Sequence, residues 1–412
     1  MSDSVLQNIH RLQRVDITAA NASLLRFLNE DLELPFEVAS VEIRSSAVSL
    51  NSINGVLDTN AGKKFFKTHI EPASLIGEYY NVKLLQDAGY PIIAPVFAST
   101  VYGKQFLIYD WFEASSLFEC IRAIETGAGS NENDLPAAAR ESDERLAELY
   151  VRSLRMMDAA THAKQPIHQL FLHRLAGKRY SDFYGGDFIT PNHHLRFAEI
   201  AAKSWIVNGV KYRDTLQTMI ATAIGALSFS GVEQVPVVIG HGDAHGGNLF
   251  YFGPDRPLTY FDPAFAGRHS PLLDIIKPLI HDYCLKWLYF PDEVARRNTV
   301  AYRVTGDTIT VDYDFSPSRF RLNLFESKLA RVITPMLARL KTNNMLAQNW
   351  QTIMQAAAMC CPLLTMNLSD RTRFTAEIAL LGLAMAVELG GCAANPQHPG
   401  WFEQRLREAA PR

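Results

Sequence analysis

The sequence predicts an α+β protein with two lobes, a small antiparallel sheet followed by a mainly helical part. Short runs of β-branched and aromatic residues gather between residues 41 and 112, and helical spacing of apolar residues dominates beyond about residue 145. A chain of 412 residues also exceeds one average domain. The expected division is an N-terminal helical segment (1–40), a first lobe (41–112) and a second lobe (113–412).

The first lobe is expected to be five strands and one helix. Residues 1–35 are rich in leucine with charges between, which predicts one or two amphipathic helices. Residues 73–88 carry helical spacing, and Gly89 is expected to cap that helix. The expected strands are 41–50, 52–59, 63–70, 92–99 and 104–112.

Residues 125–144 of the second lobe are small and polar and contain Pro and Gly, so a surface loop or a disordered insertion is expected. Helical spacing resumes at 145–163 and 195–227, and again from 319 to the end. A strand pair is expected over 236–252 and 258–265, and a β-hairpin over 301–315. The apolar stretch 378–394 contains Glu388 and is read as a buried helix rather than a membrane span.

Composition excludes several classes of function. The net charge of -3 and the pI near 6.5 do not favour a nucleic-acid-binding protein, which should show a basic stripe. The five cysteines form no C-x-x-C pair, so neither a disulfide framework nor a zinc site is indicated. The first residues lack the apolar core of a secretory signal. A cytoplasmic protein without a membrane partner, a monomer or a homodimer, is expected.

The strongest chemical signal is the segment His241–Asn248, followed by Phe261-Asp262-Pro263. Phosphoryl transfer needs a carboxylate that accepts the proton of the attacking hydroxyl, and oxygen ligands for Mg²⁺. Asp243 followed five residues later by Asn248 places a base and a metal ligand on one loop. Asp262, beyond the next strand, supplies a second metal ligand.

A second signal lies in the first lobe. Lys67 is on an expected strand and Glu78 is on the expected helix. A strand lysine held by a helix glutamate would point its ammonium at the α- and β-phosphates of ATP. Without other evidence, a lysine and a glutamate at this spacing more often form a solvent-exposed ion pair.

These residues in this order resemble the aminoglycoside phosphotransferase and choline kinase-like superfamily, whose fold is related to that of protein kinases. The resemblance covers residues of about 41 to 280 and is strongest at His241–Asn248. It implies a protein kinase-like fold and the cofactors ATP and Mg²⁺. It also implies direct in-line transfer of the γ-phosphoryl group to a hydroxyl of an amino sugar, sugar, amino alcohol or related small molecule.

The resemblance assigns roles to several residues. Asp243 matches the catalytic base, and Asn248 and Asp262 match the Mg²⁺ ligands. Asp262-Pro263-Ala264 resembles the form found in fructosamine kinases. Asp274 matches the family's later Asp, which braces the catalytic loop.

The same resemblance places the nucleotide. Residues 106–112 resemble the segment joining the lobes, so backbone groups of Asp110 and Phe112 are expected to hydrogen-bond adenine. The stretch 49–52, which includes Ser52, matches the phosphate-covering loop. It lacks the glycines that this loop often carries, and small polar residues there can still offer N–H groups and hydroxyls.

Alternatives stay open at this point. The chain could be a non-catalytic nucleotide-binding protein, or a kinase acting on proteins, although His245 stands where protein kinases have Lys. The loop could be only a tight turn of Gly, Asp and Asn. His241 is expected to be structural. Three further groups could be surface or core residues instead of site residues: His245; Arg268 with His269; and Tyr180, Phe183, Tyr184 and Phe188.

Overall fold

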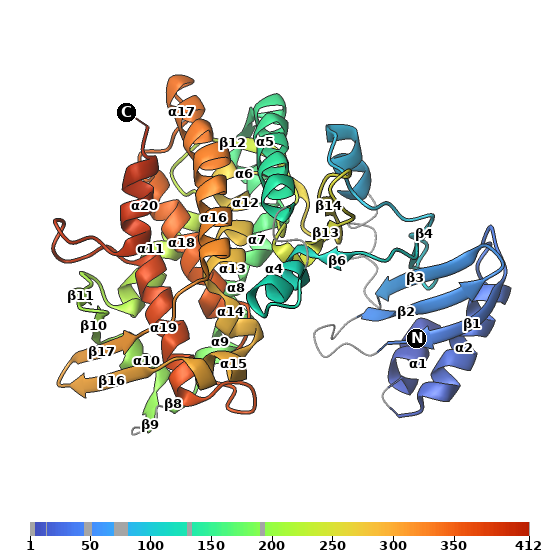
Figure 1. Ribbon diagram of the computed structural model, residues 1–412, viewed down its shortest axis with the longest axis horizontal. Helices are drawn as coiled ribbons and strands as arrows, with labels where there is room; N and C mark the ends of the chain where they lie inside the picture. The colour runs from blue at the N-terminus through green and yellow to red at the C-terminus, as the bar shows by residue number, and fades with distance from the viewer. Residues whose placement is uncertain are drawn as a thin grey trace. The chain divides into compact units, whose positions relative to one another are not determined.

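A computed structural model describes residues 5–13, 15–44, 52–69, 81–129, 134–189 and 194–411. The chain divides into two units: unit 1 is Met1–Ser115 with Thr259–Ala266, and unit 2 is Ser116–Leu258 with Gly267–Arg412 (Figure 1). This division differs from the expected one. The N-terminal helices belong with the sheet, the boundary follows Ser115, and the segment carrying Asp262 belongs to unit 1.

Unit 1 contains the expected five-stranded antiparallel sheet, with strands ordered β1-β2-β3-β5-β4. Its register pairs Gly55 of β2 with Phe66 of β3, and Lys67 of β3 with Leu107 of β5. The strands are β1 (Val38–Ile43), β2 (Ser52–Thr59), β3 (Gly62–His69), β4 (Phe97–Ser99) and β5 (Phe106–Asp110).

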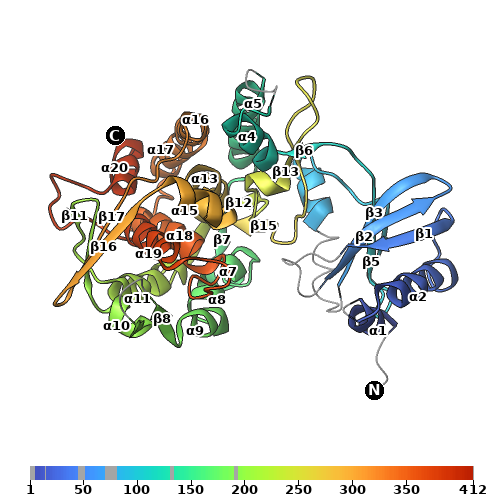
Figure 2. The same cartoon turned by 60° about the horizontal axis from the view of Figure 1, so that its bottom comes forward.

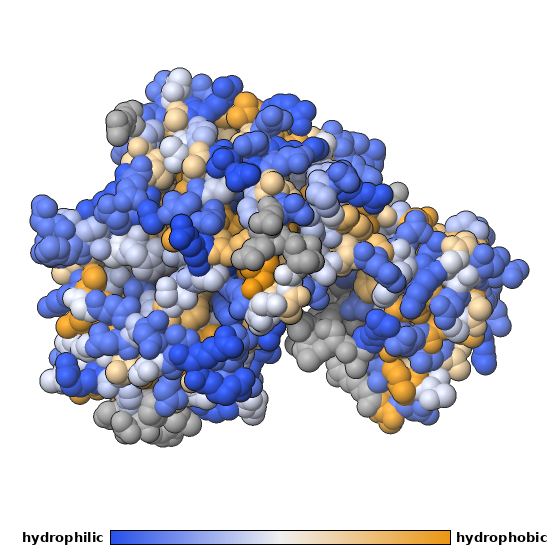
Figure 3. Space-filling view, in the orientation of Figure 1, coloured by the Kyte–Doolittle hydropathy of each residue, from blue (hydrophilic) through white to orange (hydrophobic). Residues whose placement is uncertain are grey.

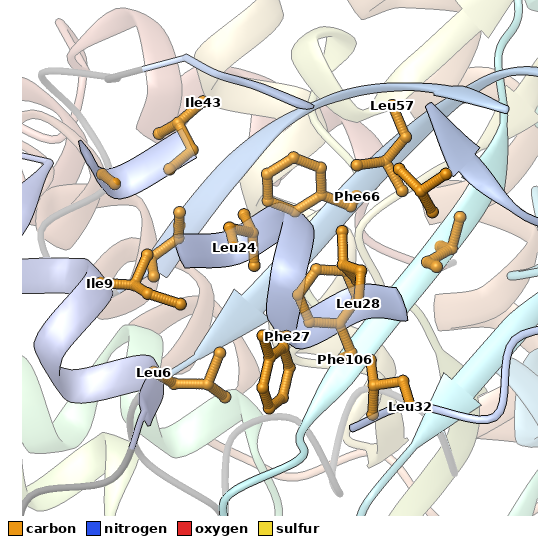
Figure 4. Close-up of a cluster of buried hydrophobic side chains, with 14 residues drawn as sticks. Leu6, Ile9, Leu24, Phe27, Leu28, Leu32, Ile43, Leu57, Phe66 and Phe106 are labelled. Atoms are coloured by element: carbon orange, nitrogen blue, oxygen red, sulfur yellow. The ribbon is translucent and has the colours of Figure 1, made fainter. Parts of the chain in front are cut away.

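Two helices cover one face of this sheet, α1 (Val5–Leu12) and α2 (Ile17–Glu30). The Asp16 side chain accepts the Ala19 N–H and so caps the start of α2. Leu24 and Leu28 of α2 pack on Phe66 of β3 in a cluster of fully buried side chains (Figure 4). Because strand side chains alternate, this cluster uses only every second residue of each strand.

The expected helix after β3 is described from residue 81 to residue 88. It ends as the sequence predicts: Gly89 has a φ of 96° and the Tyr90 N–H bonds to the Leu85 carbonyl.

Unit 2 is mainly helical (Figure 2). Its helices are α4 (Leu117–Glu125), α5 (Leu135–Ser153), α6 (Ala159–His162), α7 (Ile167–Leu170), α8 (Leu172–Leu175), α9 (Lys178–Tyr184), α10 (Phe197–Ala201), α11 (Leu216–Leu227), η1 (Gly246–Asn248), α12 (Pro271–Asp274), α13 (Ile276–Cys284), α14 (Lys286–Tyr289), α15 (Pro291–Arg297), α16 (Arg319–Lys328), η2 (Leu329–Ile333), α17 (Thr334–Thr342), α18 (Trp350–Leu364), α19 (Ala376–Gly390) and α20 (Trp401–Ala409).

Three small sheets accompany these helices, ordered β15-β12-β7, β11-β10-β17-β16 and β8-β9. The strands are β7 (Arg155–Asp158), β8 (Asp187–Ile189), β9 (His194–Arg196), β10 (Ser204–Val207), β11 (Val210–Lys211), β12 (Gln234–Gly240), β15 (Gly267–His269), β16 (Val300–Thr305) and β17 (Thr308–Tyr313). Three short strands complete the chain, β6 (Ser115–Ser116), β13 (Leu249–Tyr251) and β14 (Thr259–Tyr260).

Several expectations for unit 2 are confirmed. The hairpin turns at Gly306-Asp307, and the chain from Arg319 onward is helical. Helix α19 is buried on all sides and packs against α18, as expected for a core helix. All five cysteines are free thiols, and only Cys392 is partly exposed.

Three expectations are wrong. The stretch 145–163 is not one helix, since α5 ends at Ser153 and strand β7 follows it. Helix α5 begins at Leu135, inside the stretch 125–144 that was read as a loop, because Ala138, Ala139 and Asp143 are buried in unit 2. The stretch 195–227 is not one helix, since β10 and β11 lie within it. Trp205 and Val207 on β10 are fully buried, so packing in the sheet overrides their helical spacing.

Hydrophilic residues dominate the face shown in Figure 3, with small hydrophobic areas between them. In the described part of the chain, no helix is both long and apolar enough to span a bilayer.

We predict that Leu28→Ala lowers the free energy of unfolding of unit 1 by about 2–5 kcal/mol, because a fully buried side chain leaves a cavity between α2 and the sheet. Chemical denaturation followed by circular dichroism measures the change. Val15→Ala is the control, since Val15 is 88% exposed, and it should change the stability by less than about 0.5 kcal/mol. Equal stability of the two variants would contradict the packing described for α2.

Candidate active site

The segment His241–Asn248 is a tight loop that leaves strand β12 in unit 2. Strand β12 is central in its sheet, pairing with β15 on one side and β7 on the other. Gly242 has a φ of 81°, a left-handed conformation that favours glycine. The loop ends in the 3-10 turn η1, where the His245 ring nitrogen Nδ1 accepts the Gly247 N–H.

Asp274 holds the start of this loop. Its buried carboxylate accepts the Gly242 N–H at 2.7 Å, the Tyr150 hydroxyl, and a hydrogen bond of 2.9 Å from His269 Nδ1. These donors, His269 first, hold the pKa of the Asp274 carboxyl below its usual value although burial opposes this. A methyl group on Gly240 would lie 2.3 Å from the same carboxylate, so no larger residue fits there. The expected bracing role of Asp274 is confirmed.

Asp282 holds the far end of the loop. It lies on α13, is 3% exposed and accepts the Gly246 N–H at 2.7 Å. Burial raises the pKa of its carboxyl to about 6, with Lys328 opposing. Arg321 fixes the same residue by donating to its backbone carbonyl at 2.6 Å.

The Asp243 carboxylate is aligned by a buried lysine. Lys277 on α13 is 4% exposed, and its Nζ lies 2.9 Å from Asp243 Oδ1. Burial raises the pKa of the Asp243 carboxyl, but Lys277 and then His245 outweigh it and lower that pKa to about 2. Asp243 is therefore ionised at neutral pH and can accept a hydrogen bond from a hydroxyl.

Other cationic or aromatic groups surround Asp243. His245 Nε2 lies 3.8 Å from Asp243 Oδ1, and the His245 ring stacks on His281 at 5.4 Å. Burial, then Lys277, lowers the pKa of His281 well below its usual value, so this ring is neutral. Burial, with Arg179 contributing, lowers the pKa of Arg174 on α8 to about 10, while Asp243 favours its charged form. Arg174 keeps its positive charge at neutral pH beside the loop.

Asn248 is oriented by the loop itself. Its amide nitrogen donates to the Asp243 carbonyl at 2.8 Å, which turns the amide oxygen Oδ1 away from the loop. Among the described residues, no hydrogen-bond donor contacts that oxygen. An amide oxygen held in this way is a hard donor of the kind that Mg²⁺ binds.

Lys67 and Asp262 lie together in unit 1, on the sheet face opposite α1 and α2. Lys67 Nζ donates to Asp262 Oδ1 at 2.9 Å, and the Lys67 side chain is only 12% exposed. Asp262 has a φ of 54°, an uncommon conformation for a residue other than glycine, and its side chain is 37% exposed. Such strain is often found at functional sites.

Neighbouring contacts keep Asp262 in this conformation. Phe261 packs against Tyr109, Phe65 and Phe112 with ring centroids 5.2–6.1 Å apart. Asn81, on the helix at 81–88, donates to the carbonyl of Pro263 at 3.2 Å. The sheet and the helix thus both fix the segment that carries Asp262.

The expected adenine contacts fall at the end of β5. The Trp111 N–H bonds to the Lys63 carbonyl, so Lys64 and Asp110 form a pair without backbone hydrogen bonds between them. The backbone groups of Asp110 therefore point away from β3. The Asp110 side chain pairs with Lys64 at 2.6 Å. The Phe112 ring contacts Phe261.

Two expected site residues are described little or not at all. Glu78 lies outside the described residues, so its expected pairing with Lys67 stays a prediction. Ser52 begins strand β2, and its side chain is outside the description, as are residues 45–51.

Sequence reasoning predicted Asp274 but missed three charged residues near the loop, Lys277 and Asp282 on α13 and Arg174 on α8. Asp274, Lys277 and Asp282 are spaced by three and five residues along α12 and α13, which could have suggested one helical face. Arg174 gave no signal, since it lies in an ordinary amphipathic stretch. His269, for which the sequence allows a surface or a site role, is fully buried and hydrogen-bonds to Asp274. Tyr184 and Phe188 pack in the core, as expected.

We predict that Lys277→Met raises the pKa of Asp243 from about 2 to above about 4, because burial of the carboxylate persists while its nearest cation is lost. Carbon-13 NMR of labelled aspartates, with Asp243→Asn to assign the signal, measures this pKa. A folded-state pKa below the unfolded value makes Asp243 stabilising above about pH 4, and this contribution is lost as the pH falls toward 2.

The matched control is Lys178→Met, which removes a lysine whose side chain is 87% exposed on α9. It should leave the Asp243 pKa unchanged. A pKa that stays near 2 in Lys277→Met would show that another group sets it.

Comparison with known proteins gives a mixed result. No family model and no curated protein matches the chain. The chain is similar to solved aminoglycoside and macrolide phosphotransferases, with 10% to 12% sequence identity in the three described next.

The first is the spectinomycin phosphotransferase APH(9)-Ia in complex with ADP and spectinomycin (12% identity, TM-score 0.40, 88% of this chain and 98% of that one). The second is a thermostable mutant of the aminoglycoside phosphotransferase APH(4)-Ia with ADP and hygromycin B (10% identity, TM-score 0.45, 89% and 97%). The third is the macrolide 2'-phosphotransferase MphH from Brachybacterium faecium (12% identity, TM-score 0.41, 89% and 98%). All three TM-scores are below 0.5.

Proposed function

We propose that this protein is an ATP- and Mg²⁺-dependent phosphotransferase that moves the γ-phosphoryl group of ATP to a hydroxyl of a small molecule. The fold would be protein kinase-like, as the sequence resemblance implies. Asp243 would accept the hydroxyl proton, and Asn248 and Asp262 would hold Mg²⁺. Lys67, Glu78, Ser52 and the backbone of residues 110–112 would bind the nucleotide.

One observation carries the proposal: Asp243 is an ionised carboxylate, only 16% exposed, on a braced loop, and Lys277 Nζ lies 2.9 Å from its Oδ1. A base in this state is ready to take a proton without rearranging. The neighbouring positive charges of Lys277 and Arg174 would offset the charge that develops on a transferring phosphoryl group. The loop's bracing at Gly242 and Gly246 keeps the carboxylate in place during this step.

The residues present fit Mg²⁺. Asn248 offers an amide oxygen that is turned away from its own loop, and Asp262 has only one carboxylate oxygen bound to Lys67. Among the described residues no cluster of three or more His, Cys, Asp or Glu forms a complete metal cage. Mg²⁺ in kinases is usually held by one or two protein oxygens together with phosphate oxygens and water. When bound, the ion would offset phosphate charge.

Two alternatives were left open by the sequence. A protein-kinase activity is not favoured, because His245 occupies the position two residues after Asp243, and Lys277 from another helix supplies the cation. A non-catalytic nucleotide-binding protein is not favoured either, since it would have no use for an ionised, lysine-paired carboxylate in the loop. Proteins of either class would not release ADP in response to small-molecule hydroxyls.

We predict that Asp243→Asn lowers Mg²⁺-ATP-dependent ADP release by about 10²–10⁴-fold, because the amide cannot take the hydroxyl proton. The assay uses pooled acceptors: aminoglycosides, simple sugars, ketoamines and choline-like amino alcohols. Asp182→Asn, which changes an exposed aspartate on α9, should keep full activity. Acceptor-dependent turnover that survives in Asp243→Asn would remove Asp243 from the mechanism.

We also predict that Lys67→Ala weakens ATP binding and turnover together by about ten-fold or more, because the phosphates lose their ammonium partner. Lys63→Ala is a matched control on the same strand face, where Lys63 stacks on Trp111 with its Nζ 4.7 Å from the ring centroid. Calorimetry with ATP and Mg²⁺, then with EDTA added, separates lysine and metal contributions. Equal ATP affinity of the two variants would contradict the role given to Lys67.

A further inference from the structure

Unit 2 contains a cavity of about 280 Å³ that the phosphotransfer chemistry does not use. It lies among α13, α19, α20, the β10–β11 turn and the end of β17. No residue of the loop 241–248 lines it, and neither does Lys277. Five of the residues that line it are aromatic: Tyr212, Tyr283, Tyr313, Phe315 and Trp401.

One carboxylate stands among these rings. Glu388 on α19 lines the cavity and is 5% exposed. Its Oε2 accepts a hydrogen bond from the Tyr313 hydroxyl, and the Trp401 side chain donates to the same carboxylate. Both partners are neutral donors, so they satisfy its lone pairs without balancing its charge. Within the described part of the chain, no lysine, arginine or histidine pairs with Glu388.

A second polar group in the cavity wall has no protein partner. Tyr212 is 2% exposed, and no hydrogen bond from any described residue contacts its hydroxyl. That hydroxyl lies beside Gly400, another lining residue, where an added methyl group would come within 2.5 Å of it. A buried hydroxyl without a partner costs free energy that a ligand could recover.

We propose that this cavity binds a small molecule carrying a positively charged ammonium group. Aromatic rings attract a cation through their negatively charged faces, and the effect is largest where water is excluded. The Glu388 carboxylate would supply the one full negative charge, and the rings the remaining surface. The volume suits a ligand of modest size, near the lower end of the range for small-molecule sites.

Charge balance favours this occupant over a neutral one. Burial raises the pKa of Glu388 to about 7, with Tyr313 and then Trp401 opposing. Without a cation the carboxyl is close to half protonated at neutral pH. An ionised, buried carboxylate without a counter-charge is costly, and a bound ammonium removes that cost.

The other titratable groups around the cavity do not change charge near neutral pH. Burial raises the pKa of Tyr283 to about 12, and raises those of Tyr212, Tyr313 and Cys284 further above their usual values. Outside the lining, Glu403 is paired with Arg407, and Arg405 with Glu326. Proton release on binding therefore reports on Glu388.

The test is calorimetric binding to the full chain of tetramethylammonium and choline, against the neutral isostere 3,3-dimethylbutan-1-ol. Both cations should bind, and the neutral alcohol should bind about ten-fold or more weakly. At pH 6, titrations in two buffers of different ionisation enthalpy should show close to one proton released per bound cation. A cation affinity no higher than that of the alcohol would overturn the proposal, as would binding without proton release.

Glu388→Gln should bring the cation affinity down to that of the neutral alcohol. Glu377→Gln, a charge change in the first turn of the same helix, is the matched control and should bind as the unaltered protein does. If Glu388→Gln fails to fold, Trp401→Leu replaces it, and the ratio of cation to alcohol affinity should fall. An unchanged ratio would contradict the aromatic contribution.

Two further experiments test whether the bound ammonium belongs to a small molecule or a protein, and whether its binding is independent of phosphotransfer. A lysine-containing tripeptide that binds more tightly than choline would point to a protein partner and overturn the small-molecule form of the proposal. Asp243→Asn should keep full ammonium binding, because Asp243 is not part of the cavity wall. The two proposals can therefore fail separately.

Discussion

The candidate site depends on hydrogen bonds and an ion pair between helices α12 and α13 and the loop 241–248. A loop so rich in glycine has little preference for one conformation, and its N–H groups would remain unpaired if buried. Asp274 and Asp282 each take one of those N–H groups, while Lys277 takes the carboxylate between them. Residues of α12 and α13 thereby fix both the backbone conformation of the loop and the charge of the Asp243 carboxylate.

Much of unit 1 and of the loop could be predicted from sequence because the relevant signals are local. Alternating β-branched and aromatic residues located the five strands, and Gly89 marked a helix end. The order of Asp243 and Asn248 suggested one loop with two chemical roles, and the bond from the Asn248 amide to the Asp243 carbonyl now links them. Each of these inferences needed only residues close together in the chain.

The errors and omissions concern interactions between distant residues. The buried residues at the start of helix α5 include the small side chains Ala138 and Ala139, a weak apolar signal, and further along the Ser327 hydroxyl of α16 bonds to Asp143. The strand β10 pairs in parallel with β17, about 100 residues later, which no local pattern encodes. Lys277 looked like an ordinary helix lysine because its partner lies on another element. The pairing of Lys67 with Asp262 likewise joins residues 195 positions apart.

Unit 1 is built from two separate stretches of the chain, and this affects how it folds during synthesis. Its first 115 residues leave the ribosome well before Thr259–Ala266, the segment that completes the unit. Until then Tyr109 and Phe65 lack Phe261 as their packing partner, and Lys67 lacks Asp262. The face of the sheet against α1 and α2 can form early, whereas the opposite face has to wait for more than 140 further residues. The nascent sheet therefore exposes an apolar surface during elongation, and such surfaces make incomplete chains prone to aggregation.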